Sequence, residues 1–135
     1  MDYDEIRAEL KTRLEAVSSP QSFVYDNIPD SVVVPCAIVV PAQNVVAYHE
    51  AMGAVNSALA TCFFNVLIVA QRFETASNQE LLNDYLSTVP VALEADQTLG
   101  GEATAVLCTN ARNYGQVSFA DSVFLGLEFD LEVIV

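Results

Sequence analysis

The residue types that nucleophilic and acid–base enzymes need are scarce in this chain. It contains a single histidine, His49, with Glu50 beside it. Any Cys–His or Ser–His pair would have to use that histidine, and no G-x-S-x-G segment is present to hold a serine nucleophile. His49 stands in a stretch without clear periodicity, which favours a surface histidine beside an acid over a catalytic base. We therefore predict a protein without catalytic residues.

Metal ligands are equally sparse. Besides His49, the candidate ligands are Cys36, Cys62 and Cys108. Zinc sites usually take their ligands in closely spaced pairs, because one turn presents both to the same ion, and here each candidate stands alone. An odd number of widely spaced cysteines does not indicate a disulfide framework and favours buried thiols in a reducing compartment. We predict no metal and no other cofactor.

One group of acids has a spacing that could support chemistry. Glu128, Asp130 and Glu132 alternate along the last predicted strand and therefore share one of its faces. Side chains two residues apart on a strand lie roughly 6–7 Å from each other, which is within the range of paired catalytic carboxylates. A small domain offers little cleft, however, and the chain has no tryptophan for a sugar platform. Two other interpretations stay open: a solvated face that protects a long edge strand from aggregation, or a negative surface that a polyanion passes without binding.

Phosphate and nucleic-acid binding are disfavoured. The Gly100–Gly101 pair lacks a G-x-x-x-x-G-K pattern and any nearby cation. Eighteen acidic residues against five basic ones give a formal net charge of −13. Three of the five bases fall in the first predicted helix among several acids, whereas a nucleic-acid surface needs clustered cations.

The length and composition indicate one domain spanning residues 1–135. Hydrophobic residues make up 53% of the chain and charged residues only 17%, which suggests that a partner covers part of the apolar surface. The first ten residues lack the basic and apolar regions of a signal peptide, and no run reaches the roughly 20 apolar residues of a membrane span. We expect a protein made in a cytoplasm, with no membrane partner.

Two helices are expected to position these residues. Four apolar residues recur at helical spacing and predict an amphipathic helix over residues 4–17: Ile6, Leu10, Leu14 and Val17. A second helix is predicted to begin near Ser77 or Asn78 and to end by residue 95. Pro90 is expected to kink or restart this second helix.

Strands are predicted where β-branched and aromatic residues cluster. They cover residues 23–25, 32–40, 58–72, 103–113 and 125–135. Pro35 argues that the second strand lies at an edge or starts after the proline. The continuous apolar character of 58–72 suggests burial on both faces. The last strand, with period two over its whole length, should bury one face only.

Loops and turns complete the expected fold. We predict a loop over 42–57, which can include a short strand at 45–48, and turns at 26–30 and at Tyr114–Gly115. The order of helix, strands, helix and strands indicates the α+β class, with a mostly antiparallel sheet and two main helices packed on one face.

Several segments, taken in order, carry a resemblance to a known family. They are residues 24–30 (VYDNIPD), 35–39 (PCAIV), 48–53 (YHEAMG), 92–101 (ALEADQTLGG), 111–115 (ARNYG) and 124–134 (FLGLEFDLEVI). Together they resemble the tail terminator (tail completion, or minor tail) proteins of long-tailed bacteriophages of actinobacteria. The resemblance runs along nearly the whole chain.

The resemblance implies a structural virion protein without catalytic residues. Such a subunit assembles into a ring, typically a hexamer, at the head-proximal end of the tail. The ring stops polymerisation of the tail-tube protein and presents a surface to the neck, or head-completion, protein. DNA passes through the ring without being specifically bound, and the protein is made in the cytoplasm of the host bacterium.

Within this framework we assign roles to two groups of residues. Glu128, Asp130 and Glu132 are predicted to line the lumen of the ring, where a negative surface lets DNA pass. Arg112, Asn113 and Tyr114 are predicted to lie at the subunit interface, with Arg112 forming an intersubunit salt bridge. The segments 42–57 and 114–122 are candidates for contacts with tube and neck, because such contacts often come from long loops.

Two alternatives remain. The chain could be another neck or tail-tube protein of the same virion, because these small domains share their architecture. It could also be a small cellular ligand-binding domain or enzyme that uses the acidic strand face, which would require a well-formed pocket.

Overall fold

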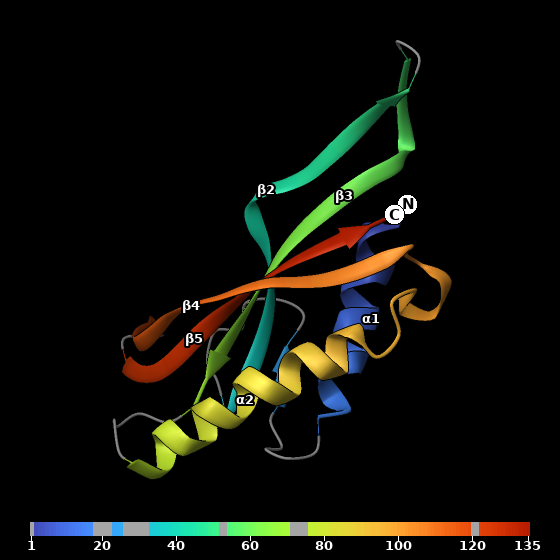
Figure 1. Ribbon diagram of the computed structural model, residues 1–135. Helices are drawn as coiled ribbons and strands as arrows, with labels where there is room; N and C mark the ends of the chain where they lie inside the picture. The colour runs from blue at the N-terminus through green and yellow to red at the C-terminus, as the bar shows by residue number, and fades with distance from the viewer. Residues whose placement is uncertain (1, 18–22, 26–32, 52–53, 71–75, 120–121) are drawn as a thin grey trace.

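The computed structural model describes residues 2–17, 23–25, 33–51, 54–70, 76–119 and 122–135. Its elements, in chain order, are α1 (Tyr3–Glu15), β1 (Phe23–Tyr25), β2 (Cys36–Ala51), β3 (Ala54–Val69), α2 (Ala76–Glu94), the short 3-10 helix η1 (Leu99–Gly101), β4 (Ala105–Phe119) and β5 (Ser122–Ile134) (Figure 1). The predicted turn at 26–30 falls outside the described residues.

The strands form one sheet in the order β1-β2-β3-β5-β4. Only the short pair β1–β2 is parallel, and the other three pairs are antiparallel. Apolar residues of α1 and α2 share one core cluster with a single face of the sheet. The predicted α+β class is confirmed: the sheet is mostly antiparallel, and both helices pack on the same face.

Alternation along β5 separates its two faces as the sequence predicts. Leu127, Phe129, Leu131 and Val133 are buried toward the helices, while the intervening residues lie on the opposite face and are partly exposed. Burial of a side chain of this size stabilises a fold by about 1.5–3 kcal/mol. This strand therefore fixes which face of the sheet carries its acidic residues.

Helix α1 matches its predicted apolar stripe. Ile6, Leu10 and Leu14 are buried against the sheet. The helix begins after Asp2, whose side chain accepts a hydrogen bond from Glu5 N at 3.2 Å and so caps a backbone donor. It ends at Glu15, two residues earlier than expected, although Val17 is still buried.

The loop predicted over 42–57 is wrong. Strand β2 runs on to Ala51 and β3 begins at Ala54, so this part of the chain is a long antiparallel hairpin. The last pair between β3 and β5 is Thr61 with Ile134, whereas β2 and β3 stay paired as far as Ala51 with Ala54. The hairpin thus projects beyond the rest of the sheet (Figure 1). We call residues 42–51 and 54–60 the arm. Residues 42–47 lie beside the part of β3 that still pairs with β5, and residues 48–51 and 54–59 lie past it.

The prediction that the strand over 58–72 is buried on both faces is wrong for most of the described part of β3. From residue 60 to residue 68, its residues alternate between fully buried ones that face the helices, such as Phe64 and Val66, and half-buried ones, such as Phe63 and Leu67. Among the side chains of β3 that the structure describes, consecutive ones are buried only at its end, around Val69. There a second, smaller cluster with Cys36, Ile38, Val69 and Phe124 packs on the face away from the helices.

Two further boundaries differ from the prediction. Strand β4 continues through Tyr114 to Phe119, and the predicted turn is instead a register shift between Arg112 and Gly115. Asn113, with φ of 57°, supplies the left-handed conformation that made this segment resemble a turn. In α2, Pro90 lies inside one continuous helix and does not restart it.

Candidate functional site

The three acids predicted to share a face do so. Glu128, Asp130 and Glu132, which we call the acidic row, lie on the sheet face opposite the helices. Strand β5 is flanked by β3 and β4, so the row lies in the interior of the sheet. The interpretation that these charges protect an edge strand is therefore wrong.

Asp130 is the centre of a polar network on this face. Arg112 Nε, on the neighbouring strand β4, donates to Asp130 Oδ1 at 3.0 Å. Asn110 Nδ2 donates to Oδ2 at 3.4 Å. With its amide oriented to match its neighbours, Asn65 Nδ2 donates to Asp130 Oδ1 at 3.0 Å from the other side, on β3. Three strands therefore meet at one carboxylate.

Arg112 also lies near a second acid of the row. Its guanidinium nitrogen is 3.5 Å from Glu128 Oε2. Because the Arg112 side chain is 47% exposed, such pairs typically contribute only about 0–1 kcal/mol to stability. No ion pair joins Glu132 to another residue in the part of the chain that the structure describes. One cation thus offsets part of the charge of the row.

The predicted interface residues lie together on β4 but point in different directions. Arg112 is on the acidic face, whereas Tyr114 OH donates to Asn83 Oδ1 of α2 at 3.1 Å, on the helix side. Asn113 is exposed at the bulge between them. The structure thus pairs Arg112 with acids of its own chain, and the intersubunit salt bridge remains a prediction.

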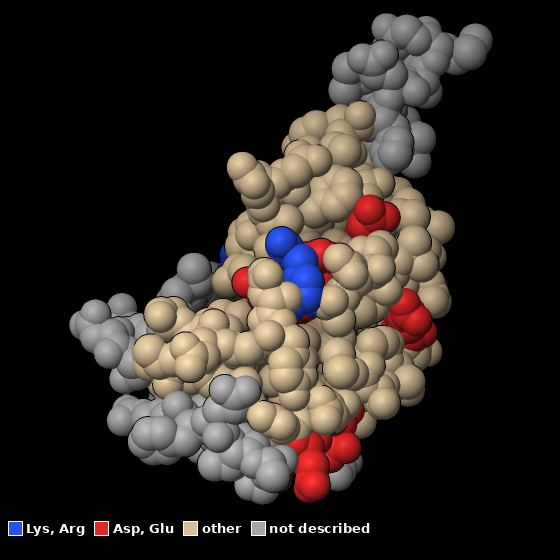
Figure 2. All heavy atoms as spheres, turned by 60° about the vertical axis from the view of Figure 1, so that its left-hand side comes forward, with Lys and Arg blue, Asp and Glu red and all other residues tan. Residues whose placement is uncertain are grey.

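A shallow hollow of about 390 Å³ lies over this network. Its lining comes from β2, β3, β4 and β5 and includes Gln43, Asn65, Thr109, Asp130 and Glu132. Its walls offer amides, a hydroxyl and carboxylates, so it could hold a small polar molecule. In the view of Figure 2, basic atoms lie directly beside acidic ones, and most of the described surface is uncharged.

The thiols have environments that suppress their reactivity. Burial raises the pKa of Cys36 to about 11. Burial, followed by the nearby carboxylates of Glu94 and Asp130, raises the pKa of Cys108 to about 11. Cys62 is also buried. Thiols of this kind stay protonated at neutral pH and are poor nucleophiles or metal ligands.

The part of the chain that the structure describes contains no cluster of three or more histidine, cysteine or acidic residues that could hold a metal ion. None of its helices is both long and apolar enough to cross a membrane. Only the backbone of His49 is described, in β2 opposite Asn56.

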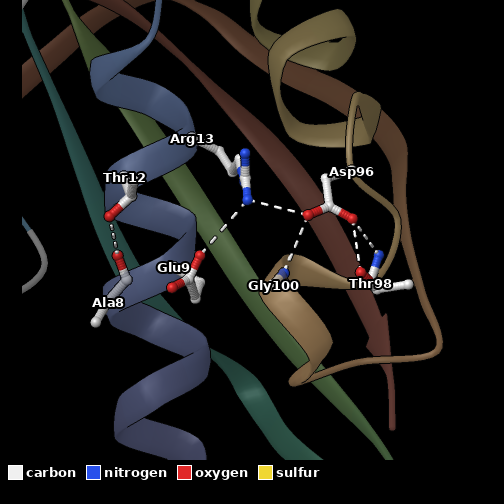
Figure 3. Close-up of polar contacts among 7 residues, drawn as sticks. All are labelled: Ala8, Glu9, Thr12, Arg13, Asp96, Thr98 and Gly100. Carbon is white, nitrogen blue, oxygen red and sulfur yellow. Dashed lines mark hydrogen bonds and ion pairs between the residues drawn. The ribbon is translucent and has the colours of Figure 1, made fainter.

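A polar turn that sequence reasoning missed joins the two helices (Figure 3). Asp96 follows α2, and its Oδ1 accepts from Thr98 Oγ1 at 2.7 Å and Thr98 N at 3.0 Å. Its Oδ2 accepts from Gly100 N at 3.1 Å and from Arg13 Nη2 of α1 at 3.0 Å. These bonds, the Thr98 hydroxyl foremost, lower the pKa of Asp96.

This Asp96 turn explains the Gly100–Gly101 pair. Both glycines have positive φ, 68° and 100°, which glycine adopts without steric cost. A Cβ on Gly100 would also lie 3.3 Å from Glu9 Oε2. An aspartate followed two residues later by threonine is a recognisable turn pattern, so the sequence did hold a signal for it. The segment serves the packing of α1 against the end of α2.

The arm is the second feature that the sequence did not reveal. Val45 and Tyr48 are 39% and 56% exposed on it. Strand β1 pairs with β2 only from Cys36 to Ile38, and no other described strand pairs with the outer edge of β2 farther along. The other edge of the arm, from Ala54 to Leu59, likewise has no described strand beside it. Two open strand edges therefore extend from the sheet.

Comparison with known proteins leaves these features to be interpreted on their own. No protein-family model matches the chain, and a search of curated proteins finds no match.

Proposed function

We propose that this chain is a structural subunit of a long-tailed bacteriophage tail, of the tail terminator type. Copies of it form a ring, six by the resemblance, at the head-proximal end of the tail. The ring ends polymerisation of the tail-tube protein and joins the tail to the neck protein. The proposal involves no catalysis and no cofactor.

The arm is the observation that carries this proposal. Isolated two-stranded ribbons are at best marginally stable in water, and open strand edges invite pairing with other chains. The arm extends well past the last β3–β5 pair, Thr61 with Ile134, and exposes Tyr48. An assembly subunit can use such an element to contact a neighbour, because an open strand edge can pair with a strand of another chain.

The acidic row supports the same proposal. It occupies the sheet face that the helices leave uncovered, so it is available to face a channel. Arg112 offsets part of its charge, but the subunit as a whole carries −13. A ring of such subunits creates a strongly negative field, which favours passage of DNA over binding. A structure of the assembled ring with Glu132 on its outer wall would contradict this role.

Two other functions compete with the terminator. A different neck or tail-tube protein of the same virion would draw equal support from the arm. A ligand-binding domain is favoured by the hollow over Asp130, which a small polar molecule could fill. The two virion functions differ in stoichiometry and in location along the tail, and the ligand-binding function requires neither an assembly nor a tail.

The test is the mass of the purified protein by multi-angle light scattering, alone and with tail-tube protein, together with tube lengths by electron microscopy. We expect an assembly near six subunits, formed alone or on the tube, and tubes that stop growing once capped at one end. An assembly found along the whole tube would indicate a tube protein. A single copy that ignores the tube protein and is stabilised by a small polar molecule would support the ligand-binding function.

A further inference from the structure

A further open strand edge lies at the β4 end of the sheet. Strand β4 is the last strand of the sheet, so one edge of its fifteen residues, Ala105–Phe119, faces no other described strand. The chain thus carries an arm at one side of its sheet order and an open edge at the other. Unpaired N–H and C=O groups along such edges form a template for a strand from another chain.

Charge makes these two elements suitable for contact between copies. Each copy carries −13, so two copies repel each other wherever their acids approach. The segment 42–60 contains one acid, Glu50, and the segment 105–119 contains none, although the whole chain has eighteen. The one charged residue of β4, Arg112, is paired with Glu128 and Asp130 of its own chain. An arm laid on β4 of a neighbour would therefore bring almost no like charges together.

The arm and β4 both expose large apolar or aromatic side chains that can pack against each other. The arm exposes Val45 and Tyr48, and β4 exposes Leu107 and Tyr114. Pairs of aromatic and β-branched residues on adjacent strands stabilise a sheet. A third strand would also satisfy backbone groups of the arm that a free ribbon leaves to water.

We propose that the arm of one copy pairs along the open edge of β4 in the next copy, so that the sheet continues from subunit to subunit. The inference rests on the proposed function and specifies the contact between neighbours in the ring. The contact joins two different surfaces, which is the kind of interface that closes into a ring when the rotation per subunit permits.

A rival surface for the arm exists on the same molecule. A mostly apolar hollow of about 350 Å³ lies between the end of α1 and α2, lined by Ala16, Val17, Val91 and Ala92. Val91 is 70% exposed there. It is less suited to an arm, because a groove between helices offers no strand edge. It therefore provides the control for the experiment.

Disulfide trapping tests the pairing directly. In a Cys108→Ser background, we would mix Tyr48→Cys protein with Asn113→Cys protein under mild oxidation. We expect a covalent dimer in the mixture, little in either variant alone, and a ladder of covalent oligomers for the double variant. Mixing Tyr48→Cys with Val91→Cys is the matched control and should give little product. Trapping to Val91→Cys but not to Asn113→Cys would overturn the proposal.

A charge placed on the arm gives a second readout. Tyr48→Glu adds a charge at an exposed position outside the core, so the fold should persist by circular dichroism while assembly weakens at least tenfold. Val91→Glu, which adds the same charge on α2, should leave assembly unchanged. Equal assembly of Tyr48→Glu and the unmodified protein would overturn the proposal.

The two proposals fail in different ways. If the protein caps tubes and assembles but neither trapping nor Tyr48→Glu has the expected effect, the arm contact is wrong and the terminator function stands. If the trapped ladder forms but tubes grow without limit, the contact is right and the terminator function is wrong. A protein that stays a single copy alone and with tube protein contradicts both.

Discussion

Arg112 on β4 and Asp130 on β5 are joined by a 3.0 Å hydrogen bond between Nε and Oδ1 on the uncovered face of the sheet. The ladder pairs Arg112 with Glu128, so the bond to Asp130 runs diagonally to the next residue of the acidic row. Arg112, one of five basic residues in the chain, thereby neutralises part of the negative charge of the acidic row.

We expect Arg112→Ala to change the free energy of unfolding by about 1 kcal/mol or less, because the pair is exposed. Its effect on assembly should be larger if Arg112 also contacts a second copy. Denaturant unfolding and light scattering would separate the two effects. Arg112→Lys is the control, since it keeps the charge and loses the planar geometry. Unchanged assembly of Arg112→Ala would contradict the predicted intersubunit salt bridge.

Asp96 should make stability depend on acid pH. Its pKa is lower in the folded protein than the ordinary value of 3.8, so its stabilising effect is complete above about pH 4–5 and is lost as the pH falls through the folded pKa. The difference in unfolding free energy between the unmodified protein and Asp96→Asn should therefore shrink below pH 4. Urea unfolding between pH 3 and pH 7 measures it.

Asp84→Asn serves as the comparison for that series. Asp84 is an exposed residue of α2, so its replacement controls for the loss of a surface carboxylate. If the Asp96→Asn difference did not shrink below pH 4, the Asp96 turn would not hold α1 through its charge.

Gly126 is expected to tolerate no side chain. A Cβ at this position would lie 2.4 Å from Ile68 O of the neighbouring strand and 2.9 Å from a methyl group of Val117. Because a backbone atom in a paired strand cannot move aside cheaply, Gly126→Ala should cost about 1–3 kcal/mol of stability. Ser118→Ala, at an exposed position of β4, should stay within about 0.5 kcal/mol. Equal midpoints of the two variants in urea would contradict the close approach.

The thiols should react slowly with Ellman's reagent at pH 8. With a pKa of about 11, roughly 0.1% of Cys108 side chains are ionised to the thiolate at pH 8, compared with about a quarter for an ordinary cysteine. Cys108, being half-buried, should react before the fully buried Cys36, and its rate should rise about tenfold per pH unit. Cys108→Ser identifies its share of the signal. A fast phase at pH 8 that this variant removes would contradict the prediction.

The parts of the fold that the sequence predicts are those with one buried face. The apolar residues around Leu10 in α1 recur at the period of a helix, and those around Phe129 in β5 recur at the period of a strand, because both sets face the same core. In the arm, the described side chains from residue 42 to residue 48 are exposed or half-buried. This stretch therefore gives only a weak strand signal, at Val45 to Tyr48, within a predicted loop.

The acidic network could not be derived, because it depends on strand register. In β4, Cys108 pairs with Leu131, but a bulge then shifts the ladder so that Arg112 pairs with Glu128. Without that shift, Arg112 would stand opposite Leu127 and face the helices. A single extra residue therefore decides which face receives the guanidinium, and alternation in one strand cannot reveal it.

The near absence of charge on the arm determines how assembly depends on ionic strength. When the joining surfaces are almost neutral and each copy carries −13, the main electrostatic contribution to association is long-range repulsion. The Debye length falls from about 30 Å at 0.01 M salt to about 10 Å at 0.1 M. Added salt should therefore tighten the assembly, which sedimentation velocity across this range would measure. A contact built on salt bridges would loosen under the same conditions.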